Sequence, residues 1–181
     1  CETQTLISDA VPIPEMLVSV SVALLLPVST LSTSNATRIV AWPPEIPRGC
    51  AYEFLNAALD HATRIVAHYG SRFDLPLLAR GDQARLARWQ SNLHDPYSLL
   101  RGIGERGIGL GALLRLNSLG GKTGSGSDAP ALFRQGKFQE LEDYCANDVM
   151  RLTDLVLKPE IRVPSGRTTS IVSLRPAAAA A

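Results

Sequence analysis

A run of apolar residues at positions 16–26 constrains the fold of this chain more than any other feature of its sequence. Val18, Val20 and Val22 alternate with small residues, and Pro27 ends the run. Alternation of this kind is typical of a β-strand, and a strand so apolar has to be buried in a sheet. The run is too short to cross a bilayer, so we predict a strand at 17–26 and no membrane segment.

Strand and helix patterns alternate along the rest of the chain. The predicted strands lie at 38–42, 64–69 and within 161–174, and the predicted helices at 49–62, 80–90, 110–119, 128–134 and 137–157. A further helix is predicted to begin close to Asp74, just after the strand that ends at Gly70. The glycine-rich stretch 120–128 is predicted to be a loop, and it lacks the residue spacing of a phosphate-binding P-loop. This alternation predicts an α/β fold with a mixed sheet flanked by helices.

The composition fits one globular domain with a hydrophobic core. The chain has 181 residues, 45% of them hydrophobic, and a formal net charge of +1. So low a charge argues against a protein whose main task is to wrap a nucleic-acid backbone. Residues 72–122 carry eight basic and four acidic side chains. This basic stretch is either a solvated helical face or a surface that faces phosphate.

The cysteines suggest a reducing environment. There are three of them, Cys1, Cys50 and Cys145, and none forms a C-x-x-C pair with another. An odd number without that spacing predicts neither a disulfide framework nor a zinc site. We therefore expect a cytoplasmic location.

Acidic residues in three separate settings carry the clearest functional signal. Glu2 lies in Cys-Glu-Thr, Asp74 follows an aromatic residue in Arg-Phe-Asp-Leu-Pro, and Tyr144 precedes Asp148 by four residues in Tyr-Cys-Ala-Asn-Asp. In this order they resemble the three motifs of the DEDD superfamily of 3′–5′ exonucleases, which read D-x-E-T, an Asp after an aromatic residue, and Y-x-x-x-D. The last motif is that of the tyrosine-bearing branch, which is often written DEDDy.

The resemblance also includes residues between these motifs. His94-Asp95, Gly121-Lys122-Thr123-Gly124 and Glu142-Asp143-Tyr144 make the chain similar to an uncharacterised branch related to B-family polymerase exonuclease domains and helicase-associated domains. It extends from Glu2 to about Leu157 and implies a ribonuclease H-like fold. We therefore predict an exonuclease-like domain at 1–158 and a C-terminal extension at 159–181.

The resemblance implies a metal-dependent enzyme that hydrolyses phosphodiester bonds stepwise from a 3′ end. Glu2, Asp74 and Asp148 would bind two Mg²⁺ or Mn²⁺ ions, which prefer carboxylate oxygens. Two such ions activate a water and neutralise the attacking and leaving oxygens. Tyr144 and Asp148 are four residues apart on a helix and share a face. The resemblance implies that the Tyr144 hydroxyl orients the attacking water.

The expected partner is a DNA or RNA strand with a 3′ end. Thr3, Arg72 and Phe73 are the candidate substrate-binding residues, since an aromatic ring and a guanidinium can stack on a base and pair with phosphate. A helicase or polymerase domain is a further candidate partner. Asp95 is a candidate to hold the proposed metal ligands in position without binding metal itself.

Two departures from the family pattern bear on activity. The Asp of D-x-E-T would fall directly before Cys1, so the chain is expected to lack this ligand and the first, central strand that leads into it, and to be impaired. Tyr69 stands where the family often has Asn.

Two other interpretations compete with an exonuclease. The first is a catalytically inactive ribonuclease H-like module that binds nucleic acid or acts as a scaffold. The second is an unrelated α/β hydrolase or transferase with scattered acidic residues, which predicts that Asp74 and Asp148 lie far apart.

Overall fold

Two paired strands form the centre of the molecule, and the two faces of this pair pack against different hydrophobic cores. The computed structural model describes residues 2–3, 18–26, 36–122, 124 and 126–171. Its strands are β1 (Glu2–Thr3), β2 (Val18–Leu25), β3 (Thr37–Ala41), β4 (Ile65–Val66), β5 (Leu93–His94), β6 (Ile161–Arg162) and β7 (Thr168–Thr169). Its α-helices are α1 (Tyr52–His61), α2 (Asp74–Ala79), α3 (Gln83–Ser91), α4 (Pro96–Gly102), α5 (Leu110–Leu116), α6 (Ala129–Arg134) and α7 (Phe138–Val156), and a 3-10 turn spans Gly126–Asp128.

The alternation of side chains along β3 divides the apolar residues between two cores. Ile39 and Ala41 join a first core cluster with α1, α2 and α3, whereas Val40 and Trp42 pack in a third core cluster with α6 and α7. β2 pairs antiparallel with β3, and Val22 lies opposite Val40 on the α7 side. Successive side chains of a strand point to opposite faces, so a strand with two apolar faces has to be covered on both.

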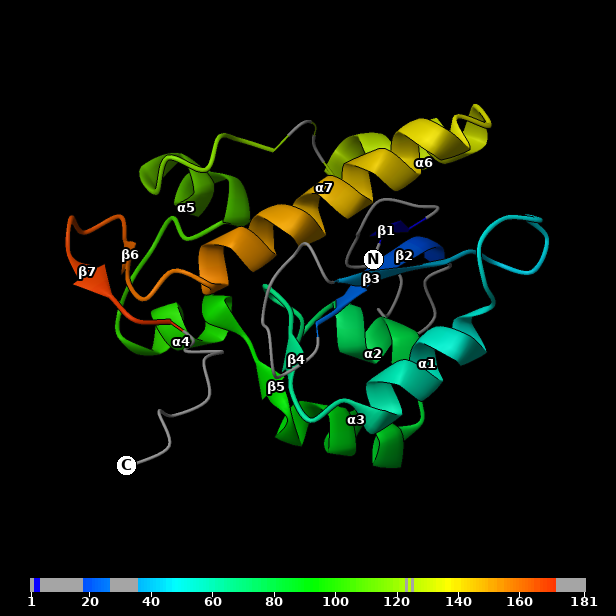
Figure 1. Cartoon of the computed structure of the whole chain (residues 1–181), viewed down its shortest axis with the longest axis horizontal. Helices are drawn as coiled ribbons and strands as arrows, with labels where there is room; N and C mark the ends of the chain where they lie inside the picture. Colours follow the sequence, from blue (N-terminus) through cyan, green and yellow to red (C-terminus); the bar gives the residue numbers. More distant parts are fainter. Residues whose placement is uncertain (1, 4–17, 27–35, 123, 125, 172–181) are drawn as a thin grey trace.

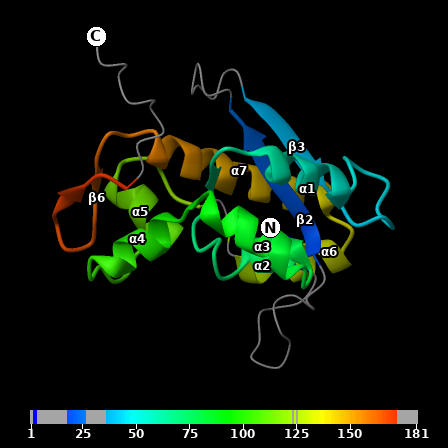
Figure 2. The ribbon, with the colours of Figure 1, turned by 90° about the horizontal axis from the view of Figure 1, so that it is seen from below.

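Helices cover both faces of this strand pair. Figure 1 shows α7 on one side of β2 and β3, and α1, α2 and α3 on the other. Figure 2 shows the same order from below, with α2 and α3 in front and α7 behind. This three-layer arrangement confirms the predicted α/β class.

The strands form three small sheets in the described residues, where we predicted one mixed sheet. The first has the antiparallel order β1-β2-β3, the second is the parallel pair β4-β5, and the third is the antiparallel pair β6-β7. Only two residues of β1 pair with β2, with Glu2 opposite Val20. The predicted strand 64–69 was too long, because the chain turns after Ala67, and Tyr69 and Gly70 belong to that turn.

The segment predicted as one strand at 161–174 is instead a hairpin. β6 and β7 pair antiparallel around a turn in which Gly166 has a φ of 85°. Ile161, Val163 and Ile171 are buried in a second core cluster with α4, α5 and α7. The hairpin therefore shares its core with the helices that precede it.

Most helices lie within or close to the predicted ranges, but α4 was not predicted as a helix, and α1 and α3 begin later than predicted. α7 begins and ends within one residue of the predicted bounds, and its apolar side packs against both the second and the third core clusters. Asp128 is the N-cap residue of α6 as predicted, but its side chain makes no capping hydrogen bond. Within the residues that the structure describes, no helix is long and apolar enough to cross a membrane.

Candidate functional site

A buried carboxylate fixes the turn that presents Asp74. The backbone N–H groups of Tyr69 and Ser71 donate to Asp95 at 2.8 and 3.2 Å, and the Ser71 hydroxyl donates at 2.7 Å. Asp95 also caps α4 by accepting from Tyr97 N–H at 3.0 Å. Asp74 follows this turn as the first residue of α2, at the carboxyl end of β4.

The ionisation of Asp95 is coupled to this geometry. Burial on its own would raise the pKa of the Asp95 carboxyl, but hydrogen bonds from Ser71, Tyr69 and Ser98 outweigh it and hold the pKa below its ordinary value. Asp95 is therefore an anionic anchor that positions the turn before Asp74.

Tyr69 adopts a conformation that few residues of its type adopt. Its φ is 69°, in the left-handed region, and its ring packs edge-on against Tyr97 with centroids 4.8 Å apart. Asn enters this region more readily than Tyr because its short polar side chain tolerates it.

Tyr144 and Asp148 lie one turn apart near the middle of α7. The Tyr144 ring packs against Gly124, where an added Cβ would lie 3.4 Å from Cδ2 of the ring. The Asp148 side chain is 15% exposed. Its Oδ1 atom is buried and has no hydrogen-bond partner among the described residues. The predicted pair therefore shares one face of the helix, as their spacing requires.

Lys122 provides the positive charge at this face. Its Nζ atom lies 2.6 Å from Oδ2 of Asp148 and 5.2 Å from the centroid of the Tyr144 ring. Its Cγ atom would lie 3.3 Å from a Cβ at Gly111, so the stem of the side chain rests on the first turn of α5. Partial burial alone would lower the pKa of Lys122, but its hydrogen bonds with Asp148 and Tyr144 raise the pKa above its ordinary value.

His68 lies in the turn that precedes Asp74. Burial lowers the pKa of its imidazole below the ordinary value, the charges of Asp95 and Asp74 oppose this shift, and that of Lys122 adds to it. Neither ring nitrogen has a well-formed hydrogen bond among the described residues. The charge of Asp74, from α2, and that of Lys122, from the loop after α5, thus both act on the His68 ring.

The other predicted site residues are less closely tied to this region. Arg72 is exposed, and Phe73 is half-buried and packs partly against the first core cluster. The backbone of Glu2 and Thr3 forms β1 beside β2. Their side chains lie outside the described part of the structure, and so does the predicted approach of Glu2 to the two aspartates.

The carboxylate of Asp148 has the donor atoms that a hard divalent cation prefers. Asp148 offers one buried oxygen that has no hydrogen-bond partner in the described part of the chain, and its second oxygen already accepts from the Lys122 ammonium group. Carboxylates in such a setting need a positive charge nearby. In the described residues no three His, Cys, Asp or Glu side chains are grouped as a metal site, and the side chain of Glu2 is not among those described.

The sequence prediction missed two residues of this region. Lys122 was assigned to a flexible loop, and His68 to the end of a buried strand. The signal that could have identified Lys122 is its position after two glycines, Gly120 and Gly121. Glycines let the backbone approach other groups closely. For His68 the sequence carries no comparable signal.

Comparison with protein-family models, with curated proteins and with solved structures found no significant match to this chain. The functional argument therefore depends on the residues and their geometry.

Proposed function

We propose that this protein is a metal-dependent 3′–5′ exonuclease with a ribonuclease H-like fold, acting on DNA or RNA. Asp74 and Asp148, with Glu2, are the proposed ligands of two Mg²⁺ or Mn²⁺ ions. Tyr144 is the proposed residue that orients the attacking water. The proposal rests on the residue motifs together with one structural observation, which is that Tyr144 and Asp148 lie one turn apart on one side of α7, with Oδ1 of Asp148 buried and without a hydrogen-bond partner among the described residues.

The arrangement of strands is compatible with this proposal. The antiparallel order β1-β2-β3 and the parallel pair β4-β5 are separate in the described residues, and β1 pairs only with β2. A longer first strand between β2 and β4 would join the two units into one mixed sheet. That is the position the family fold assigns to the strand that carries the D-x-E-T motif.

The chain's own residues have distinct tasks in this proposal. Asp95 holds the turn that places Asp74, and Asp148 approaches from α7. Tyr144 emerges one helical turn before Asp148, where its hydroxyl can accept or donate a hydrogen bond to water. Bound divalent ions would supply charge neutralisation at the attacking and leaving oxygens. Basic residues such as the exposed Arg72 would contact the phosphate backbone.

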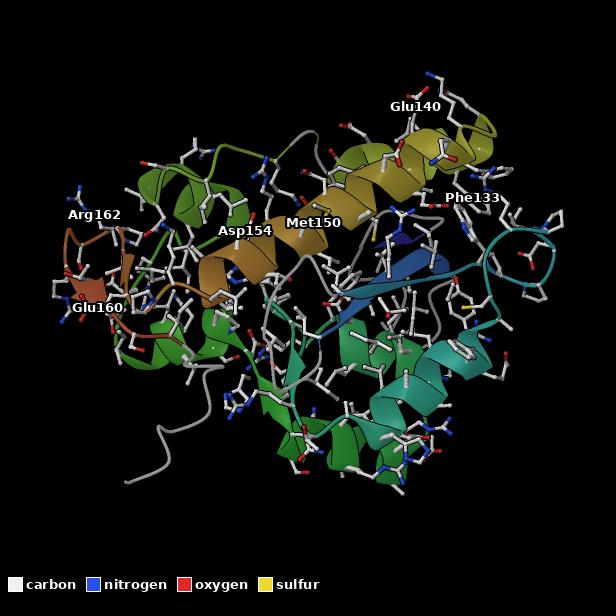
Figure 3. All side chains as sticks on the ribbon, in the orientation of Figure 1. Phe133, Glu140, Met150, Asp154, Glu160 and Arg162 are labelled. Atoms are coloured by element: carbon white, nitrogen blue, oxygen red, sulfur yellow. The ribbon has the colours of Figure 1, made fainter. Side chains whose placement is uncertain are left out.

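The proposal is tested by following release of the 3′ nucleotide from a 3′-labelled oligonucleotide with Mn²⁺ and with a chelator. We expect Mn²⁺-dependent release that Asp148→Ala lowers by about 100-fold or more, since losing a metal ligand costs several kcal/mol of transition-state stabilisation. Asp154→Ala is the matched control on the same helix. Asp154 is partly exposed, and Figure 3 labels it with Met150 along α7.

A second version of the chain makes the test decisive. The D-x-E-T pattern calls for an Asp directly before Cys1, so a chain with that residue added is assayed in parallel. We expect faster release from it than from the chain itself. Absence of Mn²⁺-dependent release from both chains would contradict the proposal.

The inactive nucleic-acid-binding or scaffolding module remains the second candidate. The observation in its favour is the Lys122–Asp148 ion pair, which already neutralises a proposed metal ligand. Binding of the labelled strand with no release in the presence of Mn²⁺, and with no change on Asp148→Ala, would support this module over the enzyme.

A further inference from the structure

The contact between Lys122 and Asp148 joins a cationic side chain to a proposed metal ligand. Nζ of Lys122 lies 2.6 Å from Oδ2 of Asp148, and the two side chains are 30% and 15% exposed. Lys122 follows α5 and belongs to no helix or strand, whereas Asp148 is fixed in the middle of α7. One partner of the pair is therefore held rigidly by its helix, and the other reaches it with a long unbranched stem.

Two further contacts define where the side chain of Lys122 lies. Its ammonium group stands over the Tyr144 ring at 5.2 Å from the centroid, and its stem packs on Gly111. The face of an aromatic ring attracts a cation. The ammonium group thus occupies a pocket of negative potential formed by one carboxylate and one ring, both from α7.

We infer that Lys122 is a tethered counter-ion of Asp148, which neutralises this carboxylate in the metal-free protein and has to leave it when a divalent cation binds. This inference rests on the proposed function, because it takes Asp148 as a metal ligand. Its physical basis is that two cations cannot share one carboxylate closely without repulsion. A half-buried carboxylate without any cation is also costly, so Lys122 stabilises the site while the metal is absent.

The inference explains two features of the site together. Oδ1 of Asp148 is buried with no hydrogen-bond partner in the described structure, so the carboxylate is only half satisfied by Lys122. A divalent ion could be bound by both oxygens of the Asp148 carboxylate, whereas the Lys122 ammonium group contacts Oδ2 alone. Lys122 is partly exposed, so its stem can turn toward solvent without unpacking a core cluster.

The first test measures Mn²⁺ affinity by calorimetry for the wild-type chain, Lys122→Met and Lys122→Arg. Met keeps the apolar stem and removes the charge, and Arg keeps the charge as the matched control. We expect Lys122→Met to bind Mn²⁺ about tenfold more tightly, because no competitor has to be displaced. We expect its thermal midpoint in chelator to fall below that of the wild type, and Mn²⁺ to raise this midpoint by more than in the wild type.

A second test needs no substitution. Lys122, Lys137 and Lys158 are the three lysines of the chain, and their modification by an amine-reactive reagent can be followed by mass spectrometry. We expect Lys122 to be protected in chelator and to become several-fold more reactive with saturating Mn²⁺. Lys137 and Lys158 are internal controls and should not change.

The possible outcomes separate the two proposals. Equal Mn²⁺ affinity of wild type and Lys122→Met, or a Lys122 that stays protected at saturating Mn²⁺, overturns the counter-ion and leaves the metal site standing. Absence of Mn²⁺ binding to both chains overturns the counter-ion and the metal-dependent function together.

Discussion

At the scale of single residues, Asp95 determines more of the site's geometry than the proposed ligands do. Its carboxylate accepts from the backbone of Tyr69 and Ser71 and from the Ser71 and Ser98 hydroxyls, while it caps α4. Only 5% of the residue is exposed. A buried acceptor shared by so many donors cannot be replaced without leaving some of them unpaired.

We predict that Asp95→Asn lowers the free energy of unfolding by about 2–3 kcal/mol, because the amide keeps one acceptor oxygen and loses the charge. Urea unfolding measures this effect. Asp82→Asn is the matched control: Asp82 caps only α3, accepting from Arg85 N–H, and Asn caps a helix about as well as Asp. A loss as large for Asp82→Asn as for Asp95→Asn would contradict the assigned role.

The same pair of chains gives a prediction for pH. Because the folded protein holds the pKa of Asp95 below its unfolded value, its carboxylate stabilises the fold fully above the unfolded pKa of about 3.9. That contribution is lost as pH falls through the folded pKa. The stability curves of wild type and Asp95→Asn should therefore converge on acidification below about pH 4. A gap that stays constant to lower pH would exclude Asp95 as the titrating group.

The sequence predicted the position of a site residue where that position follows from a local pattern of helix or strand. Tyr144 and Asp148 share a helical face because their spacing requires it, and Asp74 begins a helix because it follows a strand and a turn. Lys122 and His68 reach the site only through the path of the chain between α5 and α7 and the packing around β4. Those long-range contacts leave no periodic signal in the sequence.

At the scale of elements, two helices end in the same hydrogen-bonding motif with different residues at its key position. After α6, Lys137 N–H donates to the Leu132 carbonyl and Gly136 has a φ of 70°. After α5, Leu119 N–H donates to the Leu114 carbonyl, and Ser118 has a φ of 57°. These are Schellman ends, in which the left-handed position favours glycine.

We predict that Ser118→Gly raises the free energy of unfolding by about 0.5–1 kcal/mol, and that Gly136→Ser lowers it by about as much. Ser118 is exposed, and an added Cβ at Gly136 meets no atom within 4 Å, so the backbone alone decides both effects. Thermal unfolding of the two single variants checks the signs. Shifts in the same direction would show that another contact dominates at one of the ends.

Sequence patterns located the long elements well and the short strands poorly. The 19 residues of α7 carry enough helical periodicity to fix both ends within a residue. β4 and β6 have two residues each, too few for a period to be read. The hairpin after α7 was missed because Pro164-Ser165-Gly166, a turn signal, interrupts an apolar alternation that continues on its far side.

At the scale of the whole molecule, β3 and α7 connect the three core clusters. β3 contributes to the first and third clusters, and α7 to the second and third. Trp89 is buried in the first cluster and Trp42 in the third, and they are the two tryptophans of the chain. Shared elements predict that the clusters unfold together.

We predict that Leu155→Ala, in the second cluster, lowers the free energy of unfolding by about 2–5 kcal/mol. Leu155 has no exposed surface. We expect the same loss with either tryptophan as the only fluorescent reporter, in Trp42→Phe and Trp89→Phe backgrounds. A loss seen by Trp42 and not by Trp89 would show that the first cluster unfolds independently.

Because the two faces of β3 pack in different cores, the strand should tolerate insertions and deletions less well than substitutions. Inserting a single codon within 37–41 would turn each later side chain of the strand to the opposite face, so Trp42 would face α1 and Ala41 would face α7. A substitution in this strand disturbs one core, but a one-residue insertion misplaces both at once. We therefore expect insertions and deletions to be tolerated in the loop from Pro43 to Arg48, and to prevent folding when they fall within the strand at 37–41.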